Sequence, residues 1–464
     1  MKRIGFIAMS GVRAHNAELT ALGLTFPGFV NRNKIIASLP SLGLLTLAGL
    51  TPAKFQVEYH EIADLKTLPE LPTNFDLVAI STFTAQFYEA CEVADHYRAK
   101  RIQVVMGGIT VTSLREQAKE HCTSVVIGEG ELLWPELLAD FERGALKPFY
   151  VTDREFSLAD APMPRLDLLD PAKYNRLTVQ TSRGCPHQCE FCASSILLTS
   201  RYKLKPVEKV IAEIRAIKRI WPAPFIEFAD DNSFVHREHY QRLLAALAPE
   251  NIRWFTEADV RVAGDDELLA RIRDAGCQQI LIGFESPRRT SLYGVELRNN
   301  WKLRQQDFYR EAIARIQSYG ITVNGCFILG LDGDTGDVFD DVLHFVRESG
   351  LYEVQVTLLT AFPGTPLYAR LQREGRILRD RACELCTLFD INFQPKNMSV
   401  AELQSGFLKL AKQLYADEET RQRRAKFKRR LRTSPHFGHL KVAKMQLSAN
   451  NTFQRRSNFD SWPS

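Results

Sequence analysis

The sequence alternates short apolar, β-branched runs with longer stretches whose apolar residues recur at helical spacing, and it does so in two separate series. This alternation is typical of parallel βαβ units. Five strands are expected in the first series, over residues 3–9, 55–62, 77–82, 103–106 and 124–127. Five parallel strands with intervening helices predict an open, doubly wound, Rossmann-like α/β domain over residues 1–144.

The second series follows a proline-rich segment, residues 145–176, that is predicted to be a linker. Its six expected strands cover residues 178–181, 225–229, 253–257, 279–284, 322–329 and 353–359. Six βα units are too few for an eight-stranded barrel, so residues 177–374 predict a partial (β/α)6 barrel. Its functional groups are expected at the carboxyl ends of the strands. A small helical C-terminal region over residues 375–433 and a flexible tail over residues 434–464 complete the predicted chain.

Composition excludes several classes of protein. Of the 464 residues, 45% are hydrophobic and 25% are charged, which is typical of a globular chain. No apolar run approaches the roughly 18 residues of a transmembrane segment, and the N-terminal apolar run is too short for a signal peptide. The nine cysteines are an odd number and unevenly spread, so we predict a cytoplasmic protein whose thiols are reduced and bind metal.

The positive charge of the chain is concentrated at its C-terminal end. Residues 421–464 contain twelve Lys or Arg and one acid, Asp460, which leaves 48 basic against 54 acidic residues in residues 1–420. The positive net charge of the whole chain therefore does not indicate a nucleic-acid partner, because residues 1–420 are net negative. Only residues 421–432 could form a basic patch. A solvated helix end is the favoured interpretation of that run.

Three cysteines form the strongest chemical motif. Cys185, Cys189 and Cys192 have C-x3-C-x2-C spacing directly after an expected strand. Three clustered thiolates suit a soft metal, and three ligands on a [4Fe-4S] cluster leave one iron open to bind another group. A structural zinc ion is the alternative. Zinc prefers four closed ligands, however, and only His187 lies near as a fourth, so the spacing favours the cluster.

This motif, with the aromatic Phe191 before its last cysteine, resembles the radical S-adenosylmethionine (SAM) superfamily. The resemblance implies that Cys185, Cys189 and Cys192 hold a [4Fe-4S] cluster and that SAM binds the open iron. One-electron reduction by an external donor, such as a flavodoxin or ferredoxin, would then yield a 5'-deoxyadenosyl radical. The resemblance identifies no catalytic residue beyond the cluster.

Eight further residues at the ends of expected strands resemble the SAM contacts of the family: Asp230, Asp231, Asn232, Glu257, Arg261, Gly283, Glu285 and Gly330. The resemblance implies that the first three accept from the ammonium of SAM, that the next four hold its ribose and carboxylate, and that the last lies near its adenine. A helix N-cap is the alternative for Asn232, and surface ion pairs are the alternative for the charged residues. Because these residues follow successive strands, they are predicted to converge on one cleft.

The N-terminal domain resembles the cobalamin-binding domain of B12-type radical enzymes. The turns after the third, fourth and fifth expected strands carry this resemblance, which implies cobalamin contacts from Ser81, Thr82, Thr84, Gln86, Gly107, Gly108, Gly128, Glu129 and Glu131. Thr82, Thr84 or Gln86 would face the cobalt. The D-x-H-x-x-G element that supplies a lower histidine ligand in many cobalamin proteins is absent, so the lower face would be unligated. A vestigial domain without cobalamin is the alternative.

Residues 332–335 and 388–395 resemble the branch of the family that contains the hopanoid methylases. The resemblance implies methylation of an unactivated carbon of a small-molecule or lipid substrate. One alternative is the transfer of the 3-amino-3-carboxypropyl group of SAM to an acceptor such as a metalloid. A more distant alternative is a zinc-stabilised module that binds nucleic acid or a membrane.

The other six cysteines are assigned mainly to structure. Cys383 and Cys386 form a C-x2-C pair that could hold a second cluster, a zinc ion or a soft substrate atom. Two ligands are insufficient alone, so a structural role is the favoured interpretation. Cys91, Cys122, Cys277 and Cys326 are expected in the core, where free cysteine is common.

Overall fold

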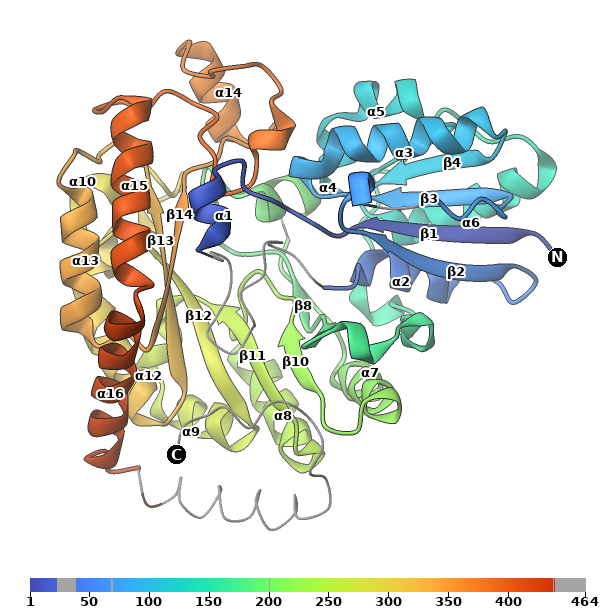
Figure 1. Ribbon diagram of the computed structural model, residues 1–464. Coiled ribbons are helices and arrows are strands. Elements are labelled where there is room, and N and C mark those ends of the chain that lie inside the picture. Colours follow the sequence, from blue (N-terminus) through green and yellow to red (C-terminus); the bar gives the residue numbers. More distant parts are fainter. Residues whose placement is uncertain (23–38, 68–69, 200, 437, 439–464) are drawn as a thin grey trace.

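The computed structural model describes residues 1–22, 39–67, 70–199, 201–436 and 438. Two six-stranded parallel sheets, one in each half of the chain, form its framework (Figure 1). Within these residues no helix has both the length and the apolar character needed to cross a bilayer.

The N-terminal sheet has the strand order β2-β1-β3-β4-β5-β6. Its strands are β1 (Arg3–Met9), β2 (Gln56–Ile62), β3 (Leu77–Ser81), β4 (Gln103–Gly107), β5 (Ser124–Ile127) and β6 (Phe149–Val151). The five predicted strands are present. The sixth, β6, pairs with β5 and lies in the segment that the sequence predicts to be a linker. A strand of three residues is too short to show a periodic pattern, so the prediction of five strands is corrected to six.

Helices cover both faces of this sheet and confirm the doubly wound prediction. They are α2 (Leu42–Leu50), α3 (Phe87–Ala99), α4 (Ile109–Ser113), α5 (Arg115–His121) and α6 (Gly130–Arg143). Helices α2 and α6 pack on one face, and α3, α4 and α5 pack on the other. Ile4 and Phe6 of β1 contact the first layer, whereas Ile7 contacts the second. The central strands β1, β3, β4 and β5 are mostly apolar because both of their faces are buried, whereas the edge strand β2 is mainly polar and only partly buried.

The second sheet is a partial barrel with the strand order β14-β13-β12-β11-β10-β7. Its strands are β7 (Leu177–Val179), β10 (Phe225–Phe228), β11 (Arg253–Ala258), β12 (Cys277–Glu285), β13 (Thr322–Leu329) and β14 (Glu353–Leu358). The (β/α)6 prediction is confirmed: among the described residues the edge strands β7 and β14 do not pair with each other. A short antiparallel pair, β8 (Ser182–Arg183) with β9 (Lys203–Leu204), follows β7 and brackets the cysteine motif.

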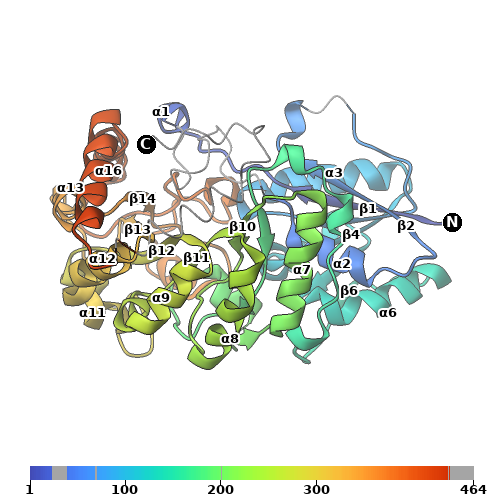
Figure 2. The same cartoon turned by 90° about the horizontal axis from the view of Figure 1, so that it is seen from below.

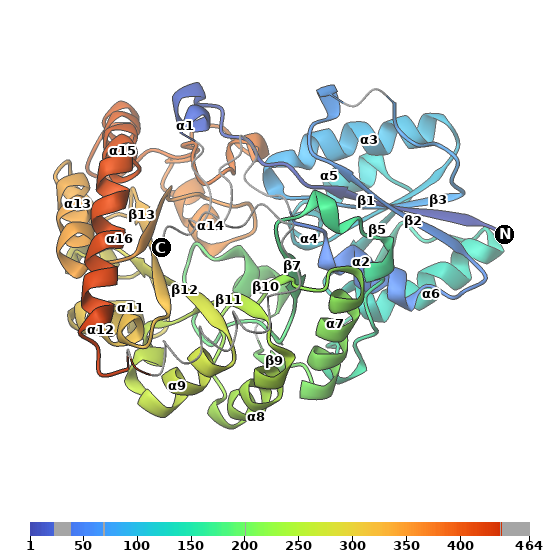
Figure 3. The ribbon, with the colours of Figure 1, turned by 60° about the horizontal axis from the view of Figure 1, so that its bottom comes forward.

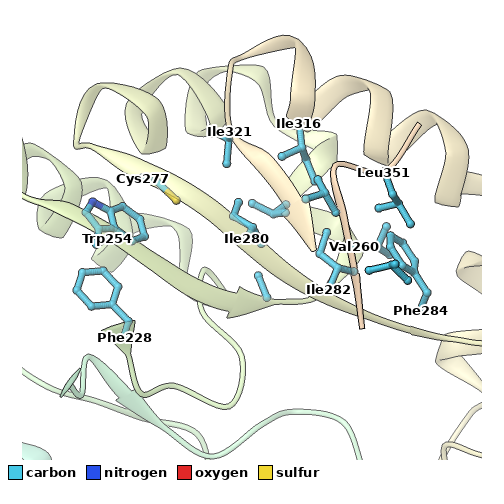
Figure 4. Packing of buried hydrophobic residues seen from close by; sticks show 14 of the residues in the cluster. Phe228, Trp254, Val260, Cys277, Ile280, Ile282, Phe284, Ile316, Ile321 and Leu351 are labelled. Carbon is cyan, nitrogen blue, oxygen red and sulfur yellow. The ribbon is translucent and has the colours of Figure 1, made fainter. Parts of the chain in front are cut away.

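Helices cover the outer surface of the barrel strands. They are α7 (Val207–Ile220), α8 (Arg237–Leu247), α9 (Asp266–Asp274), α10 (Arg289–Leu292), α11 (Trp301–Gln305), α12 (Tyr309–Ser318) and α13 (Val338–Ser349). On β12, Ile280, Ile282 and Phe284 are buried in the core beneath these helices (Figure 4). A Cβ at Gly283 would lie 2.6 Å from the carboxylate of Glu285, so these two positions share the opposite, inner face of β12. Helix α14 (Pro366–Arg373) lies instead beyond the carboxyl ends of the strands (Figure 1), where Leu367 and Leu371 pack with Leu331 and Leu359.

Two C-terminal helices, α15 (Val400–Leu414) and α16 (Asp417–Arg432), complete the outer layer beside β14. Arg423 in α16 is buried and donates to the carbonyl oxygen of Leu414 at 2.7 Å, and Arg424 pairs with Glu353 of β14 at 3.3 Å. The interpretation of residues 421–432 as a solvated helix end is therefore wrong for the face of α16 that carries Arg423 and Arg424. The predicted tail, residues 434–464, lies almost entirely outside the described residues.

The N-terminal domain packs beside the β7 end of the barrel sheet, and α15 and α16 lie at the opposite end (Figures 1, 2 and 3). The N-terminal helix α1 (Ala17–Ala21) crosses to the C-terminal side and packs on α15. This arrangement brings the carboxyl ends of strands from both sheets to one shared interface, where the predicted site residues lie.

Candidate active site

The loop that carries Cys185, Cys189 and Cys192 begins at Gly184, directly after β8. Gly184 has a φ of +89°, and a Cβ there would lie 2.5 Å from the carbonyl oxygen of Arg201, so only glycine fits. All three thiols are free. Burial raises the pKa of Cys185 to about 11 and also raises the pKa values of Cys189 and Cys192.

Asp230 and Asp231, which follow β10, anchor this loop. Asp230 is buried and accepts from the backbone amides of Thr181 at 2.7 Å and Ser182 at 2.9 Å. Asp231 accepts from the Gly184 amide at 2.8 Å and from the hydroxyl of Ser194, so it ties together the two ends of the loop. Both carboxylates thus have partners within the chain, which does not support the predicted contact with the ammonium of SAM.

Asn232, Asp259 and Arg261 form a network next to the cysteine loop. The Asn232 amide lies 3.7 Å from Sγ of Cys185 and donates to Asp259 at 3.0 Å. Asp259 also bonds His187 at 3.1 Å and Arg261 at 2.6 Å. Burial favours protonation of Asp259, but these hydrogen bonds outweigh it and lower its pKa. Arg261, predicted to contact SAM, is therefore paired within the chain. Asp259 was not among the residues predicted from the sequence.

A second loop, residues 293–301, supports the cysteine loop from the other side. Its buried Glu296 accepts from the backbone amides of Gln188 at 3.3 Å and Asn299 at 2.9 Å. Trp301 stacks on His187 with ring centroids 4.1 Å apart. The sequence analysis did not identify Glu296 or Trp301, because their contacts with the cysteine loop join segments more than one hundred residues apart along the chain.

Gly283 and Glu285, predicted to contact SAM, share one buried partner. Nζ of Lys302 donates to Glu285 at 2.6 Å and to the carbonyl oxygen of Gly283 at 2.7 Å. Burial alone would lower the pKa of Lys302, but the negative charges of Glu285 and Cys189 raise it. A buried ammonium therefore lies near the cysteine thiols. Lys302 was also missed from the sequence, where it is one lysine in a polar stretch.

The interior of the barrel contains a carboxylate without a partner. The side chain of Glu257 in β11 lies in the open interior of the barrel, and its carboxylate makes no hydrogen bond or ion pair within the described part of the chain. Desolvation by the surrounding barrel, and then the negative charges of Glu227 and Asp231, raise its pKa to about 8. Desolvation, and then the negative charge of Glu257, raise the pKa of Cys326 on β13, whose side chain is half-buried. The prediction of Cys326 as a core residue is therefore wrong.

A cavity of about 280 Å³ lies between the two domains. Its wall in the N-terminal domain includes Ser81, Gly107, Gly108, Gly128, Glu129 and Glu131, at the carboxyl ends of β3, β4 and β5. Its wall in the barrel comprises Gln180, Arg183 and Ala229, after β7, at β8 and after β10. Six of the nine predicted cobalamin contacts thus line one cavity, and Arg183 connects it to Cys185, two residues further along the chain.

Glu129 and Glu131 also join the domains. Arg183 pairs with Glu129 at 2.7 Å and with Glu131 at 2.6 Å, and Lys203 adds a bond to Glu129 at 2.7 Å. All four side chains are largely buried. The two carboxylates are therefore structural links between the domains, a role that the resemblance did not imply.

The three residues predicted to face cobalt differ in their surroundings. Thr82 is half-buried, and its hydroxyl donates to the carbonyl oxygen of Phe83 at 2.9 Å. The hydroxyl of Thr84 bonds that of Thr110 at 3.0 Å. Gln86 is 2% exposed, and its side-chain oxygen accepts from the Gly11 amide at 2.9 Å. The side chain of Gln86 thus links the loop after β3 to the loop after β1. This hydrogen bond does not support the predicted contact with cobalt.

Phe191 and Gly330 lie in an apolar part of the site. Phe191 packs on a buried cluster with Val295 and Phe393. Gly330 has a φ of +97° and donates its amide to Asp334 at 2.8 Å. Neither position carries a polar side chain, so both shape the site by packing.

The remaining C-x2-C pair lies away from this site. Cys383 is fully buried in the N-terminal core with Cys91 and Cys122, and Cys386 accepts a hydrogen bond from Asn392 at 3.7 Å. Among the described residues no group of three or more His, Cys, Asp or Glu side chains could hold a single metal ion. The burial of Cys383 and Cys386 supports the structural interpretation.

Comparison with known proteins covers most of the chain. A family model described as "Radical SAM superfamily" matches residues 179–346, and one described as "Domain of unknown function (DUF4070)" matches residues 365–455. Bacteriochlorophyllide d C-12(1)-methyltransferase of Chlorobaculum tepidum is 27% identical over 387 residues, 81% of this chain and 82% of that protein. Hopanoid C-2 methylase of Rhodopseudomonas palustris is 27% identical over 360 residues, 75% of this chain and 67% of that protein.

Two solved structures have the same arrangement of domains. TsrM of Kitasatospora setae, described as a radical S-adenosylmethionine methyltransferase, has a TM-score of 0.61 at 17% identity and covers 82% of this chain and 77% of its own. OxsB, described as a cobalamin-dependent S-adenosylmethionine radical enzyme, has a TM-score of 0.58 at 16% identity over 90% of this chain and 63% of its own. At these identities the likeness establishes the fold alone.

Proposed function

This chain belongs to the radical SAM superfamily, in the class with an N-terminal B12-binding-type domain, and we propose that it is a cobalamin-dependent methyltransferase. In this proposal it methylates an unactivated carbon of a small-molecule or lipid substrate. One observation carries the proposal: the cysteine loop and the glycine-lined cavity adjoin across the interface of the two domains, at the carboxyl ends of both sheets. Parallel α/β sheets bind their ligands at this edge.

The residues around the cysteine loop fit a [4Fe-4S] cluster with SAM. Cys185, Cys189 and Cys192 are the proposed ligands, because they are free thiols on one loop that Asp231 and Glu296 hold in place. Lys302 offsets negative charge near Cys189. When bound, the cluster and SAM supply reductive cleavage of a carbon–sulfur bond. The accessible, unpartnered carboxylate of Glu257 is the proposed acceptor for polar groups of SAM.

The residues around the interdomain cavity fit one part of a cobalamin molecule. Gly107 and Gly108 leave the space at the end of β4 free of side chains, and a Cβ on Gly108 would lie 3.3 Å from the hydroxyl oxygen of Ser81. The rest of the lining is mainly apolar, with Leu42, Leu47 and Trp134 from α2 and α6. Apolar walls with a few polar groups are typical of sites for large organic ligands.

Changing Gly107 to leucine is expected to abolish cobalamin binding and leave iron binding unchanged. A Cβ at Gly107 meets only Val126, at ordinary contact distances of 3.4 Å or more, so the backbone tolerates it and the rest of the side chain must enter the cavity. Metal analysis after anaerobic reconstitution with iron, sulfide and hydroxocobalamin measures both cofactors. Gly336→Leu, at an exposed position with open space around it, is the matched control. Equal cobalt in both variants would contradict the proposed cobalamin site.

Product analysis tests the reaction. The reconstituted enzyme is incubated with SAM and a chemical reductant, with candidate tetrapyrrole and lipid substrates. Formation of 5'-deoxyadenosine together with S-adenosylhomocysteine supports methylation of a carbon. Formation of 5'-methylthioadenosine would overturn methylation and support aminocarboxypropyl transfer. A colourless protein that contains only zinc would overturn radical chemistry altogether. The cytoplasmic location and the external electron donor are further parts of this proposal.

A further inference from the structure

The loop that supports the cysteine motif presents an exposed apolar surface. Tyr293 is 74% exposed and Leu297 is 49% exposed, and both belong to residues 293–298. The loop has an ordered backbone, because the amide of Gly294 donates to the side chain of Asn300 at 2.7 Å and buried Glu296 accepts from the amides that follow it. Two large apolar side chains are thus exposed within five residues of one ordered loop, where a bound partner would bury them.

This surface also carries positive charge. Arg298 and Arg304 are exposed, and no ion pair of either is found among the described residues. Two acids close to them in sequence are already engaged: Glu296 is buried, and Asp307 pairs with Arg289 at 3.2 Å. Residues 1–420 as a whole contain 54 acidic against 48 basic residues, so these two arginines differ in sign from the net charge of that part of the chain. An acidic partner is therefore attracted to this loop.

The same loop contacts the cysteine motif directly through the backbone. Cys189 and Glu296 form an antiparallel bridge. The Leu297 amide donates to the carbonyl oxygen of Gln188 at 2.9 Å, and the Glu190 amide donates to the carbonyl oxygen of Val295 at 2.9 Å. An electron can therefore pass from exposed Leu297 to Cys189 through one hydrogen bond, to Gln188, and the peptide bond that joins Gln188 to Cys189.

We propose that residues 293–298, together with Arg304, form the docking surface for an acidic one-electron carrier protein with a flavin or iron–sulfur centre. This proposal rests on the proposed function, which requires a reductant. The reduced centre of the carrier loses one electron, and the group held by Cys185, Cys189 and Cys192 gains it. Helices α10 (Figure 1) and α11 (Figures 2 and 3), which flank the loop, lie on the side of the barrel away from the N-terminal domain. Docking there leaves the interdomain cavity free.

The test compares two double variants that change charge equally. Tyr293→Asp with Arg298→Glu alters the proposed surface. Val151→Asp with Arg154→Glu is the control: Val151 is 64% exposed, and Arg154 is exposed with no ion pair among the described residues. Stopped-flow absorbance follows reduction of the reconstituted protein by a reduced, acidic flavodoxin and, separately, by titanium(III) citrate. The iron content of each variant confirms that it is loaded.

Reduction of the Tyr293/Arg298 variant by flavodoxin is expected to be at least about tenfold slower than that of the wild type, with a weaker dependence on salt. Its reduction by titanium(III) citrate and the behaviour of the control variant are expected to match the wild type. Equal slowing of both variants, or slowing of neither, would overturn the docking surface. A wild-type protein that accepts no electron from either reductant would instead overturn the proposed function, and this proposal with it.

Discussion

Replacing Cys185, Cys189 and Cys192 together by alanine is expected to give a colourless protein that retains almost none of the iron and does not cleave SAM. The three thiols are the only cysteines on the loop after β8, so no neighbour on that loop can substitute for them. Because the loop is held by Asp231 and Glu296 rather than by the metal alone, the protein is expected to remain folded. Iron analysis and the absorption spectrum after anaerobic reconstitution measure the loss.

A matched triple variant makes this result specific. Cys91, Cys383 and Cys386 are equally free and are buried away from the cysteine loop. Changing all three to alanine removes the same number of thiols and creates small cavities, so some loss of stability is expected, while the iron is retained. Loss of iron in this control would mean that the C-x2-C pair holds metal, which would contradict the structural role assigned to it here.

Replacing Arg183 by methionine is expected to weaken the interface between the two domains. The change leaves Glu131 without its partner and removes one partner of Glu129, and both carboxylates are largely buried. An uncompensated buried charge costs about 3 kcal/mol or more. That cost corresponds to roughly a hundredfold increase in the population of separated domains. The rate of proteolytic cleavage within residues 145–176, together with cobalt content, measures the effect.

The control for this prediction is Arg201→Met. Arg201 pairs with Glu155 at 3.3 Å, but its side chain is 76% exposed. Exposed pairs contribute at most about 1 kcal/mol, so cleavage and cobalt content are expected to stay near those of the wild type. If Arg183→Met behaves like this control, the domains are held together by apolar contacts and not by the buried ion pairs.

Much of the fold could be predicted because the signals are local. Most strand boundaries of both sheets agree with the predicted ones to within two residues, since burial on both faces leaves continuous apolar runs in the sequence. Strand β6 was missed because three residues show no period. The helical nature of residues 421–432 could be predicted, but the burial of Arg423 could not, because it depends on Glu353 and Leu414 in other elements.

The candidate site divides in the same way. The C-x3-C-x2-C motif lies within eight residues, so its spacing and its position after a strand can be read from the sequence directly. The supporting residues Glu296, Trp301 and Lys302 could not be found there. Their partners come from other strands and loops, and no local pattern distinguishes them from surface residues.

The order of the two α/β domains, the cysteine motif and the glycine-rich turns at the carboxyl ends of the strands can all be recognised in the amino-acid sequence. The tertiary structure decided which of the polar residues are free to act. Asp230, Asp231, Glu129 and Glu131 are bonded within the chain, whereas Glu257 has no partner among the described residues. The physical reason is that a buried carboxylate must be paired or hydrogen-bonded, and its partners are set by distant segments that meet only in the folded chain.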